Sequence, residues 1–250
     1  MTYCVGMALD RGIVLMSDTR TNSGVDNISV FRKMFHWSNP GERIVALMTA
    51  GNLATTQAVV SQLEDRNKAP SERHNTLLEA PSMFQVATLV GKVLRDTIRA
   101  RDEAFGHESS GTFTASMILA GQIKGMDPCL FLIYPEGNFI EASFDTPFFQ
   151  IGETKYGRPI LIRGYEKTMS FEDAIKLMMV SFDSTLKANL SVGLPIDLMV
   201  LERDRFEPAH ARRISAADTY FRAISEGWAD ALKQAFNSLP DYSFYNDAER

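Results

Sequence analysis

The chain has 250 residues, of which 45% are hydrophobic and 23% charged, and its formal net charge is −5. This composition is typical of a folded domain with its own core, and it argues against a nucleic-acid-binding protein, which usually carries a basic stripe. No run approaches the roughly 20 apolar residues of a membrane helix, and the first residues lack the charged and apolar regions of a secretory signal. We therefore expect a soluble, cytoplasmic protein with two reduced thiols, Cys4 and Cys129.

The first fifty residues are predicted to form two antiparallel hairpins. Asp10-Arg11-Gly12 joins the first pair of strands and Asn39-Pro40-Gly41 joins the second, because both sequences are turn formers. The predicted strands cover residues 2–9, 13–17, 33–37 and 43–49.

After residue 51 the hydrophobic residues recur at helical spacing, and predicted helices begin near residues 53, 81 and 171. The predicted strands of this part cover residues 113–119, 130–134, 139–143, 148–151 and 196–201. Segregated strands and helices indicate an α+β domain over residues 1–202, in which two antiparallel sheets pack on each other with helices outside.

Residues 203–250 are predicted to be a C-terminal helical extension. Its basic cluster, Arg203 to Arg213, is interrupted by acidic residues and is interpreted as a surface turn. The following helix carries an apolar face that either packs on the same domain or docks on a neighbouring subunit, and the sequence leaves both open.

Thr2 is the candidate nucleophile. Methionine aminopeptidases remove Met1 efficiently when the next side chain is small, and the product is a threonine with a free α-amine beside its hydroxyl. An α-amine has an ordinary pKa of about 7.7–8.0, so it can take the proton of the hydroxyl. One residue can thus supply nucleophile and base, as in the N-terminal threonine variant of the catalytic triad.

Two charged residues lie where they can support Thr2. Asp18 ends the strand that pairs with the strand of Thr2, and Lys33 begins the next predicted strand. A buried lysine near the amine would favour its free-base form, and Asp18 would keep that lysine charged and oriented. Each residue alone is typical of a solvated surface, and only the three together are specific.

The chain resembles the proteasome β-subunit family of N-terminal nucleophile hydrolases in Thr2 and in the stretches 12–20, 31–34 and 49–51. The resemblance covers residues 2–202. The C-terminal addition and the sequence Gly24-Val25-Asp26-Asn27-Ile28 are most similar to its bacterial branch, called Anbu, the ancestral β-subunit.

The resemblance implies a four-layer αββα sandwich, self-assembly into a ring or short helical turn, and cleavage of peptide bonds through an acyl-enzyme without metal or cofactor. The substrate would be a peptide or unfolded protein. No phosphate-binding glycine loop is present, so any ATPase that feeds the site would be a separate chain.

The family roles can be carried to the matching positions. Thr2 is then the nucleophile, Lys33 lowers the pKa of its amine, and Asp18 orients Lys33. The backbone N–H of Gly51 donates to the oxyanion, an interaction commonly worth ~2.7–4 kcal/mol.

Four further residues receive supporting roles from the same resemblance. Arg20 braces the loop beside the site. Phe31, Thr49 and Leu53 line the first specificity pocket, which suggests a modest apolar side chain there.

The chain departs from the family pattern at two places. It reads Gly152-Glu153-Thr154 where the family has Gly-Ser-Gly, so Glu153 either replaces a serine that relays the amine proton or is a surface turn residue. Near residue 188 the family has an aspartate followed three residues later by a serine, and here only Ser191 matches.

Three functions stay open on this basis: a threonine peptidase, an amidase acting on an isopeptide or small amide, and a catalytically quiet assembly scaffold. A Cys4 nucleophile is disfavoured, because no nearby histidine is implied.

Overall fold

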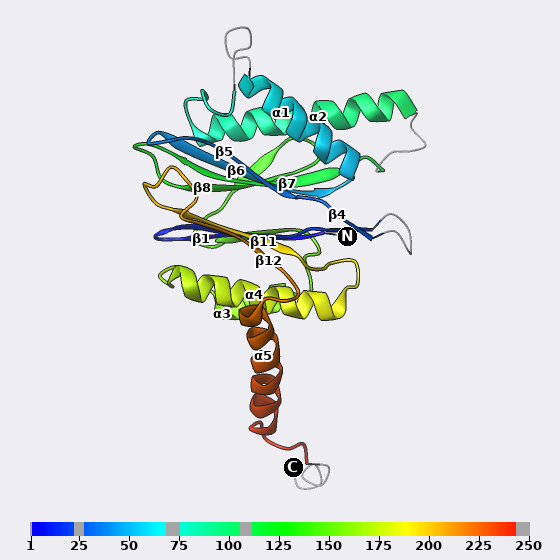
Figure 1. Ribbon diagram of the computed structural model, residues 1–250, viewed down its shortest axis with the longest axis vertical. Coiled ribbons are helices and arrows are strands. Elements are labelled where there is room, and N and C mark those ends of the chain that lie inside the picture. The colour runs from blue at the N-terminus through cyan, green and yellow to red at the C-terminus, as the bar shows by residue number, and fades with distance from the viewer. Residues whose placement is uncertain (1, 23–27, 69–75, 106–111, 244–250) are drawn as a thin grey trace, which may run out of the picture.

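The computed structural model describes residues 2–22, 28–68, 76–105 and 112–243, so Met1 and the stretch from Gly24 to Asn27 lie outside it. The described chain forms two five-stranded antiparallel sheets that stack face to face, with helices on both outer faces (Figure 1). Three clusters of buried apolar side chains fill the spaces between these layers. The α+β sandwich expected from the sequence is confirmed, with the layer order helix, sheet, sheet, helix.

The first sheet contains the N-terminal end of the chain, and its strand order is β10-β1-β2-β11-β12. Its strands are β1 (Tyr3–Leu9), β2 (Gly12–Asp18), β10 (Phe148–Gly152), β11 (Ile196–Glu202) and β12 (His210–Ile214). Asp10 and Arg11 form the turn between β1 and β2, as predicted. Because β1 lies between β10 and β2, the start of the chain is held on both sides.

The second sheet has the order β5-β6-β7-β8-β9. Its strands are β5 (Met34–Asn39), β6 (Arg43–Gly51), β7 (Ala115–Ile123), β8 (Cys129–Ile133) and β9 (Phe139–Glu141). The predicted turn at Pro40 and Gly41 joins β5 to β6, where Gly41 has a φ of +76° that favours glycine.

Four helices cover the two sheets. α1 (Leu53–Lys68) and α2 (Met83–Phe105) lie on the second sheet, and α3 (Arg158–Gly164) and α4 (Phe171–Ala188) lie on the first (Figure 1). α4 begins where predicted, because the hydroxyl of Ser170 accepts a hydrogen bond from the backbone N–H of Asp173 at 3.0 Å.

Three short elements go beyond the sequence prediction. The hairpin of β3 (Arg20–Asn22) and β4 (Ile28–Val30) has three residues per strand, and α3 has seven, which is too short for a clear period. The basic cluster is not only a turn: its last part forms β12, an edge strand that pairs with β11. Four of the five β12 residues are exposed, so the alternation that marks a strand is missing.

α5 (Thr219–Asn237) projects away from the sandwich beyond α4 (Figure 1). Asp218 caps its first turn by accepting from the N–H of Phe221, the one buried residue of the helix. Further along, Leu232 is 49% exposed and Phe236 74% exposed. Among the helices that the structure describes, none combines the length and the apolarity needed to cross a membrane.

Candidate active site

Thr2 lies just before β1, and two hydrogen bonds hold the peptide group that joins it to Tyr3. Its carbonyl oxygen accepts from the backbone N–H of Glu153 at 2.6 Å, and the N–H of Tyr3 donates to Oδ1 of Asp18 at 3.0 Å. Gly152 permits this approach, because a Cβ there would lie 2.0 Å from the Thr2 carbonyl oxygen. Only 8% of Thr2 is exposed, so the residue is fixed inside the protein.

Asp18 is fully buried directly behind Thr2. Besides the Tyr3 N–H, it accepts from Nζ of Lys33 at 2.8 Å and from the N–H of Gly193 at 3.4 Å. Burial raises the pKa of Asp18 above its ordinary value, and the ammonium of Lys33 and the two N–H groups oppose this shift. The ion pair supplies the counter-charge that a buried lysine needs.

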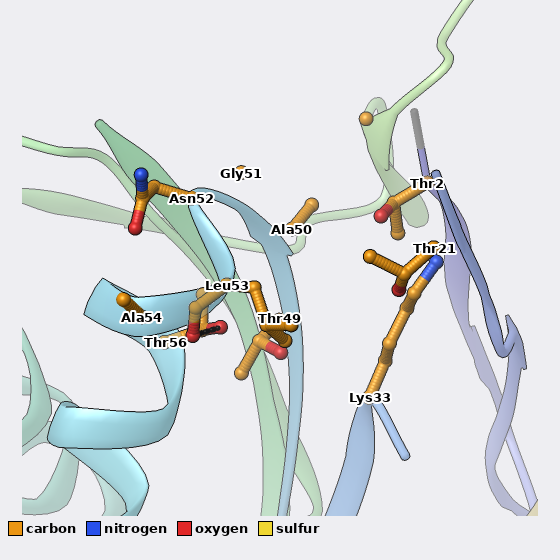
Figure 2. Close-up of a pocket in the computed structure, with 11 residues that line it drawn as sticks. Thr2, Thr21, Lys33, Thr49, Ala50, Gly51, Asn52, Leu53, Ala54 and Thr56 are labelled. Atoms are coloured by element: carbon orange, nitrogen blue, oxygen red, sulfur yellow. Dashed lines mark hydrogen bonds between the residues drawn. The ribbon is translucent and has the colours of Figure 1, made fainter. Parts of the chain in front are cut away.

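Lys33 is 4% exposed and its ammonium group makes two hydrogen bonds, to Asp18 and to the carbonyl oxygen of Arg20 at 2.6 Å. An ammonium has three donors, so one remains. The end of the Lys33 side chain points toward Thr2 in Figure 2. The structure therefore brings Thr2, Asp18 and Lys33 together, although they lie at the ends of three different strands of the sequence.

A cavity of about 470 Å³ opens beside Thr2. Its lining residues are Thr2, Thr21, Lys33, Thr49, Ala50, Gly51, Asn52, Leu53, Ala54, Thr56 and Gly152 (Figure 2). The candidate nucleophile, the lysine and the candidate oxyanion glycine thus line the same cavity.

Gly51 lies at the junction of β6 and α1. Its φ is +114°, and a Cβ would lie 2.4 Å from the carbonyl oxygen of Thr114, so no other residue fits without a shift. The next residue, Asn52, caps α1 by accepting from the N–H of Thr55 at 3.0 Å. The positive end of the α1 dipole and the amide of Gly51 therefore lie at the cavity, where they suit a developing negative charge.

Arg20 braces the loop between α4 and β11. Its Nη1 donates to the carbonyl oxygen of Leu190 at 3.1 Å. A Cβ on Gly193 would lie 2.2 Å from the Arg20 guanidinium carbon, so the glycine makes room for this side chain. The same loop reaches Asp18 through the Gly193 N–H.

Glu153 is 7% exposed, which rules out the reading as a surface turn residue. Its Oε1 accepts from the N–H of Lys155 at 2.8 Å and its Oε2 from Nδ2 of Asn189 at 3.1 Å. Oδ1 of Asn189 accepts from the N–H of Ser191 at 3.0 Å. Ser191 thus joins this cluster through its backbone, one step removed from Thr2.

The predicted specificity pocket is found only in part. Thr49 and Leu53 line the cavity, whereas Phe31 is absent from the described lining residues. The backbone N–H of Phe31 instead donates to the carbonyl oxygen of Thr19 at 2.9 Å.

Sequence reasoning missed two residues of this site, Thr21 and Asn189. Thr21 follows Arg20 in β3 and lines the cavity. The sequence signal for Asn189 is its place beside the missing aspartate, two residues before Ser191, and the structure puts it at the C-cap of α4.

Cys4 is fully buried, and this burial raises the pKa of its thiol. A neutral, inaccessible thiol is a poor nucleophile. The described residues contain no group of three or more His, Cys, Asp or Glu that could hold a metal ion.

A sequence model of the family described as proteasome subunit matches residues 2–201. The proteasome subunit beta of Methanopyrus kandleri is 25% identical over 206 residues, which cover 81% of this chain and 88% of that protein. The family match ends just before the C-terminal extension.

Solved structures match nearly the whole chain, α5 included. The Anbu (Gly-1) mutant from Hyphomicrobium sp. strain MC1 is 50% identical, with a TM-score of 0.89, and the match covers 97% of this chain and 100% of that one. Anbu (ancestral beta-subunit) from Yersinia bercovieri is 44% identical, with a TM-score of 0.89 and coverage of 96% and 99%.

A structure from Pseudomonas aeruginosa described as the helical assembly of the Anbu complex is also 44% identical, with a TM-score of 0.89 and coverage of 98% and 100%. The sandwich fold agrees with these similarities. The chain therefore belongs to the proteasome subunit family of N-terminal nucleophile hydrolases, and within it to the Anbu group.

Proposed function

We propose that the chain is a threonine peptidase that cleaves peptide bonds through an acyl-enzyme on Thr2, once Met1 is removed. The observation that carries this proposal is the shared cavity: Thr2, Lys33 and Gly51 all line it, and Asp18 holds Lys33 from behind. A nucleophile, a fixed cation and an oxyanion donor are the three parts that acyl transfer needs.

The reaction has two balanced steps. The Thr2 hydroxyl oxygen attacks the carbonyl carbon of the scissile bond, and its proton passes to the α-amine of the same residue. The C–N bond breaks, that proton moves to the departing amine, and the acyl group remains on Thr2 as an ester. Water, losing a proton to the same α-amine, then attacks the ester and releases the acid, which restores the hydroxyl.

Lys33 and Gly51 assist these steps without exchanging bonds. A cation near the amine disfavours the protonated form, so the amine is ready as a base. The Gly51 N–H and the start of α1 stabilise the oxyanion that forms in each step.

Copies of the chain are proposed to assemble through α5, into a ring or a short helical turn. The helix extends past α4 with Leu232 and Phe236 exposed, and apolar side chains on a projecting helix suit a subunit contact. The related Anbu complex from Pseudomonas aeruginosa is described as a helical assembly. An unfolded protein or peptide is the proposed substrate, in the cytoplasm.

A catalytically quiet scaffold is the second candidate. It is favoured by two departures from the family pattern: Glu153 stands in place of a serine, and no aspartate lies three residues before Ser191. An amidase acting on an isopeptide or small amide would use the same catalytic residues as the peptidase, so substrate panels alone separate those two.

Intact mass spectrometry with a peptide epoxyketone tests the proposal. The chain is first shown by its mass to begin at Thr2. We expect one adduct, located on residue 2, that is lost in Thr2→Ala and Lys33→Ala and retained in Thr88→Ala, an exposed threonine of α2. A chain that begins at Thr2 and gives no adduct would establish the scaffold instead.

A further inference from the structure

The side chains that line the cavity beside Thr2 are unusually rich in hydroxyl groups. Apart from the catalytic residues and backbone glycines, they are Thr21, Thr49, Ala50, Asn52, Leu53, Ala54 and Thr56. Thr49 lies on the helix-facing side of β6, two residues after Leu47, and is only 3% exposed. Its hydroxyl can therefore reach solvent only through the cavity.

Two of these hydroxyls have no partner among the residues that the structure describes. The Thr56 hydroxyl donates to the carbonyl oxygen of Leu53 at 2.9 Å. By contrast, the hydroxyls of Thr21 and Thr49 make no hydrogen bond within the described part of the chain. A hydroxyl that loses water without gaining a partner is costly, so any group that fills the cavity is selected for its ability to bond these two.

The charge of the lining excludes ionised side chains. Lys33 is the one ionised side chain of the described lining, and no carboxylate faces it from within the cavity. A lysine or arginine side chain would lie near this ammonium and find no carboxylate among the described lining residues to pair with. A carboxylate would compete for the donor of Lys33 that points toward Thr2.

An apolar side chain fits no better. It would displace water from Thr21 and Thr49 and leave both hydroxyls unsatisfied, which is how a polar site rejects an analogue without hydrogen-bonding groups. Phe31, the large apolar residue that the family resemblance assigns to this pocket, is not among its described lining residues.

We propose that the cavity selects a neutral side chain that both donates and accepts hydrogen bonds, a carboxamide such as that of glutamine or asparagine, on the acyl side of the scissile bond. Thr49 and Thr21 are the specificity-determining residues. A carboxamide oxygen accepts from one hydroxyl and its NH2 group donates to the other. This inference rests on the proposed peptidase function and names its substrate class.

The test measures how fast residue 2 is modified by four peptide epoxyketones that differ only in the side chain next to the reactive carbonyl: Gln, Leu, Glu or Lys. We expect the Gln probe to react roughly tenfold faster than the Leu probe, since the net effect of one or two neutral hydrogen bonds is of this size. Equal or faster reaction of the Leu, Glu or Lys probe would overturn the proposal.

Thr49→Val keeps the shape of the side chain and removes the hydroxyl, and Thr21→Val does the same at the other wall. Each is expected to lower the rate of the Gln probe relative to that of the Leu probe roughly fivefold to tenfold. Thr88→Val, on the exposed face of α2, is the matched control and should change neither rate. Equal slowing of both probes by Thr49→Val would also overturn the proposal.

A small β-lactone that carries no peptide side chain reports the reactivity of Thr2 itself in every variant. If neither the lactone nor any epoxyketone modifies residue 2, the peptidase function fails and this selectivity fails with it. If residue 2 is modified but the Leu probe is preferred, the peptidase function stands and only the selectivity is wrong.

Discussion

The carboxylate of Glu153 accepts a hydrogen bond from Nδ2 of Asn189 at 3.1 Å, although 36 residues separate the two along the chain. This bond joins the turn after β10 to the C-terminal end of α4. Because the backbone N–H of Glu153 also holds the Thr2 carbonyl oxygen at 2.6 Å, the pair fixes the position of the candidate nucleophile.

The protein should remain stable when the negative charge moves from residue 153 to residue 189, but not when both residues carry a carboxylate. In Asn189→Asp two carboxylates meet, and we expect the free energy of unfolding to fall by about 1–3 kcal/mol at pH 7. The double variant Glu153→Gln/Asn189→Asp can remake all three hydrogen bonds and should recover most of the loss. Urea unfolding at pH 7 measures the free energy of unfolding of the single and the double variant.

A double variant that is no more stable than Asn189→Asp alone would show that the hydrogen bond does not connect the two turns. Ser191→Ala is the control, because the backbone N–H that Asn189 accepts from is unchanged.

Variants of the Lys33–Asp18 ion pair should distinguish its contribution to folding stability from its contribution to the reactivity of Thr2. Lys33→Met leaves the Asp18 carboxylate buried without a partner and is expected to cost about 3–5 kcal/mol of unfolding free energy. Asp18→Asn/Lys33→Met removes both charges and should recover much of this stability, yet still lose at least roughly 100-fold in probe reaction at residue 2. Thermal unfolding and intact mass spectrometry give the two readouts, and restored labelling in the double variant would contradict the role of Lys33.

The reaction of Thr2 should depend on two protonations at acid pH. Burial raises the pKa of Asp18 above its ordinary value, so the native state binds this proton more readily than the unfolded state. As pH falls through that raised pKa, Asp18 becomes neutral and Lys33 loses its counter-charge, but this protonation itself favours the folded state. Labelling should therefore fall while circular dichroism still shows a folded chain.

In a plot of log labelling rate against pH, the slope should steepen below the pKa of Asp18, because the α-amine and Asp18 are then both protonated. Asp18→Asn should show only the single step of the amine. The same steepening in Asp18→Asn would assign it to another group.

Gly51→Ala should damage the site by moving the oxyanion amide. The new Cβ would lie 2.4 Å from the Thr114 carbonyl oxygen, at a φ of +114°, so β6 and β7 must shift apart. We expect a loss of about 1–3 kcal/mol or more from strain and at least roughly 100-fold slower labelling. Gly41→Ala is the control, since its φ is also positive and a Cβ there meets nothing within 4 Å; it should lose stability but keep labelling.

Charged substitutions on the exposed face of α5 should reduce the size of the assembly. Leu232→Glu and Phe236→Glu each place a charge on the exposed apolar side of the projecting helix. We expect light scattering to show smaller particles for both variants. Labelling of Thr2 in the isolated subunit is the second readout. Asn237→Glu, about 140° around the helix from Leu232, should leave the particle unchanged. Unaltered particles in both apolar-face variants would assign the contact to another surface.

Several parts of this architecture follow directly from the sequence. The turn formers around Gly12 and Gly41 mark the hairpins, and the N-cap Ser170 marks the start of α4. Thr2, Asp18 and Lys33 can be singled out because they lie at the ends of paired strands. Each of these features depends on residues that are close together in the sequence, so the sequence alone predicts it.

The remaining parts depend on contacts between distant segments. Asn189 becomes part of the site only because the end of α4 meets the turn after β10. Thr21 reaches the cavity through a hairpin of three-residue strands, too short to show an alternating pattern. β12 has an edge position with four exposed residues, so its sequence looks like a turn.

Thr2 is immobilised by Glu153 on one side and, through Tyr3, by Asp18 on the other, and Asp18 in turn is capped by Gly193. The last of these supports, Gly193, lies far along the chain from the candidate nucleophile. Such long-range pairings form late in folding, because loop closure must precede them. The order of the strands thus makes the position of Thr2 depend on a segment far along the chain, so the candidate nucleophile is fixed only after the loop around Gly193 has folded.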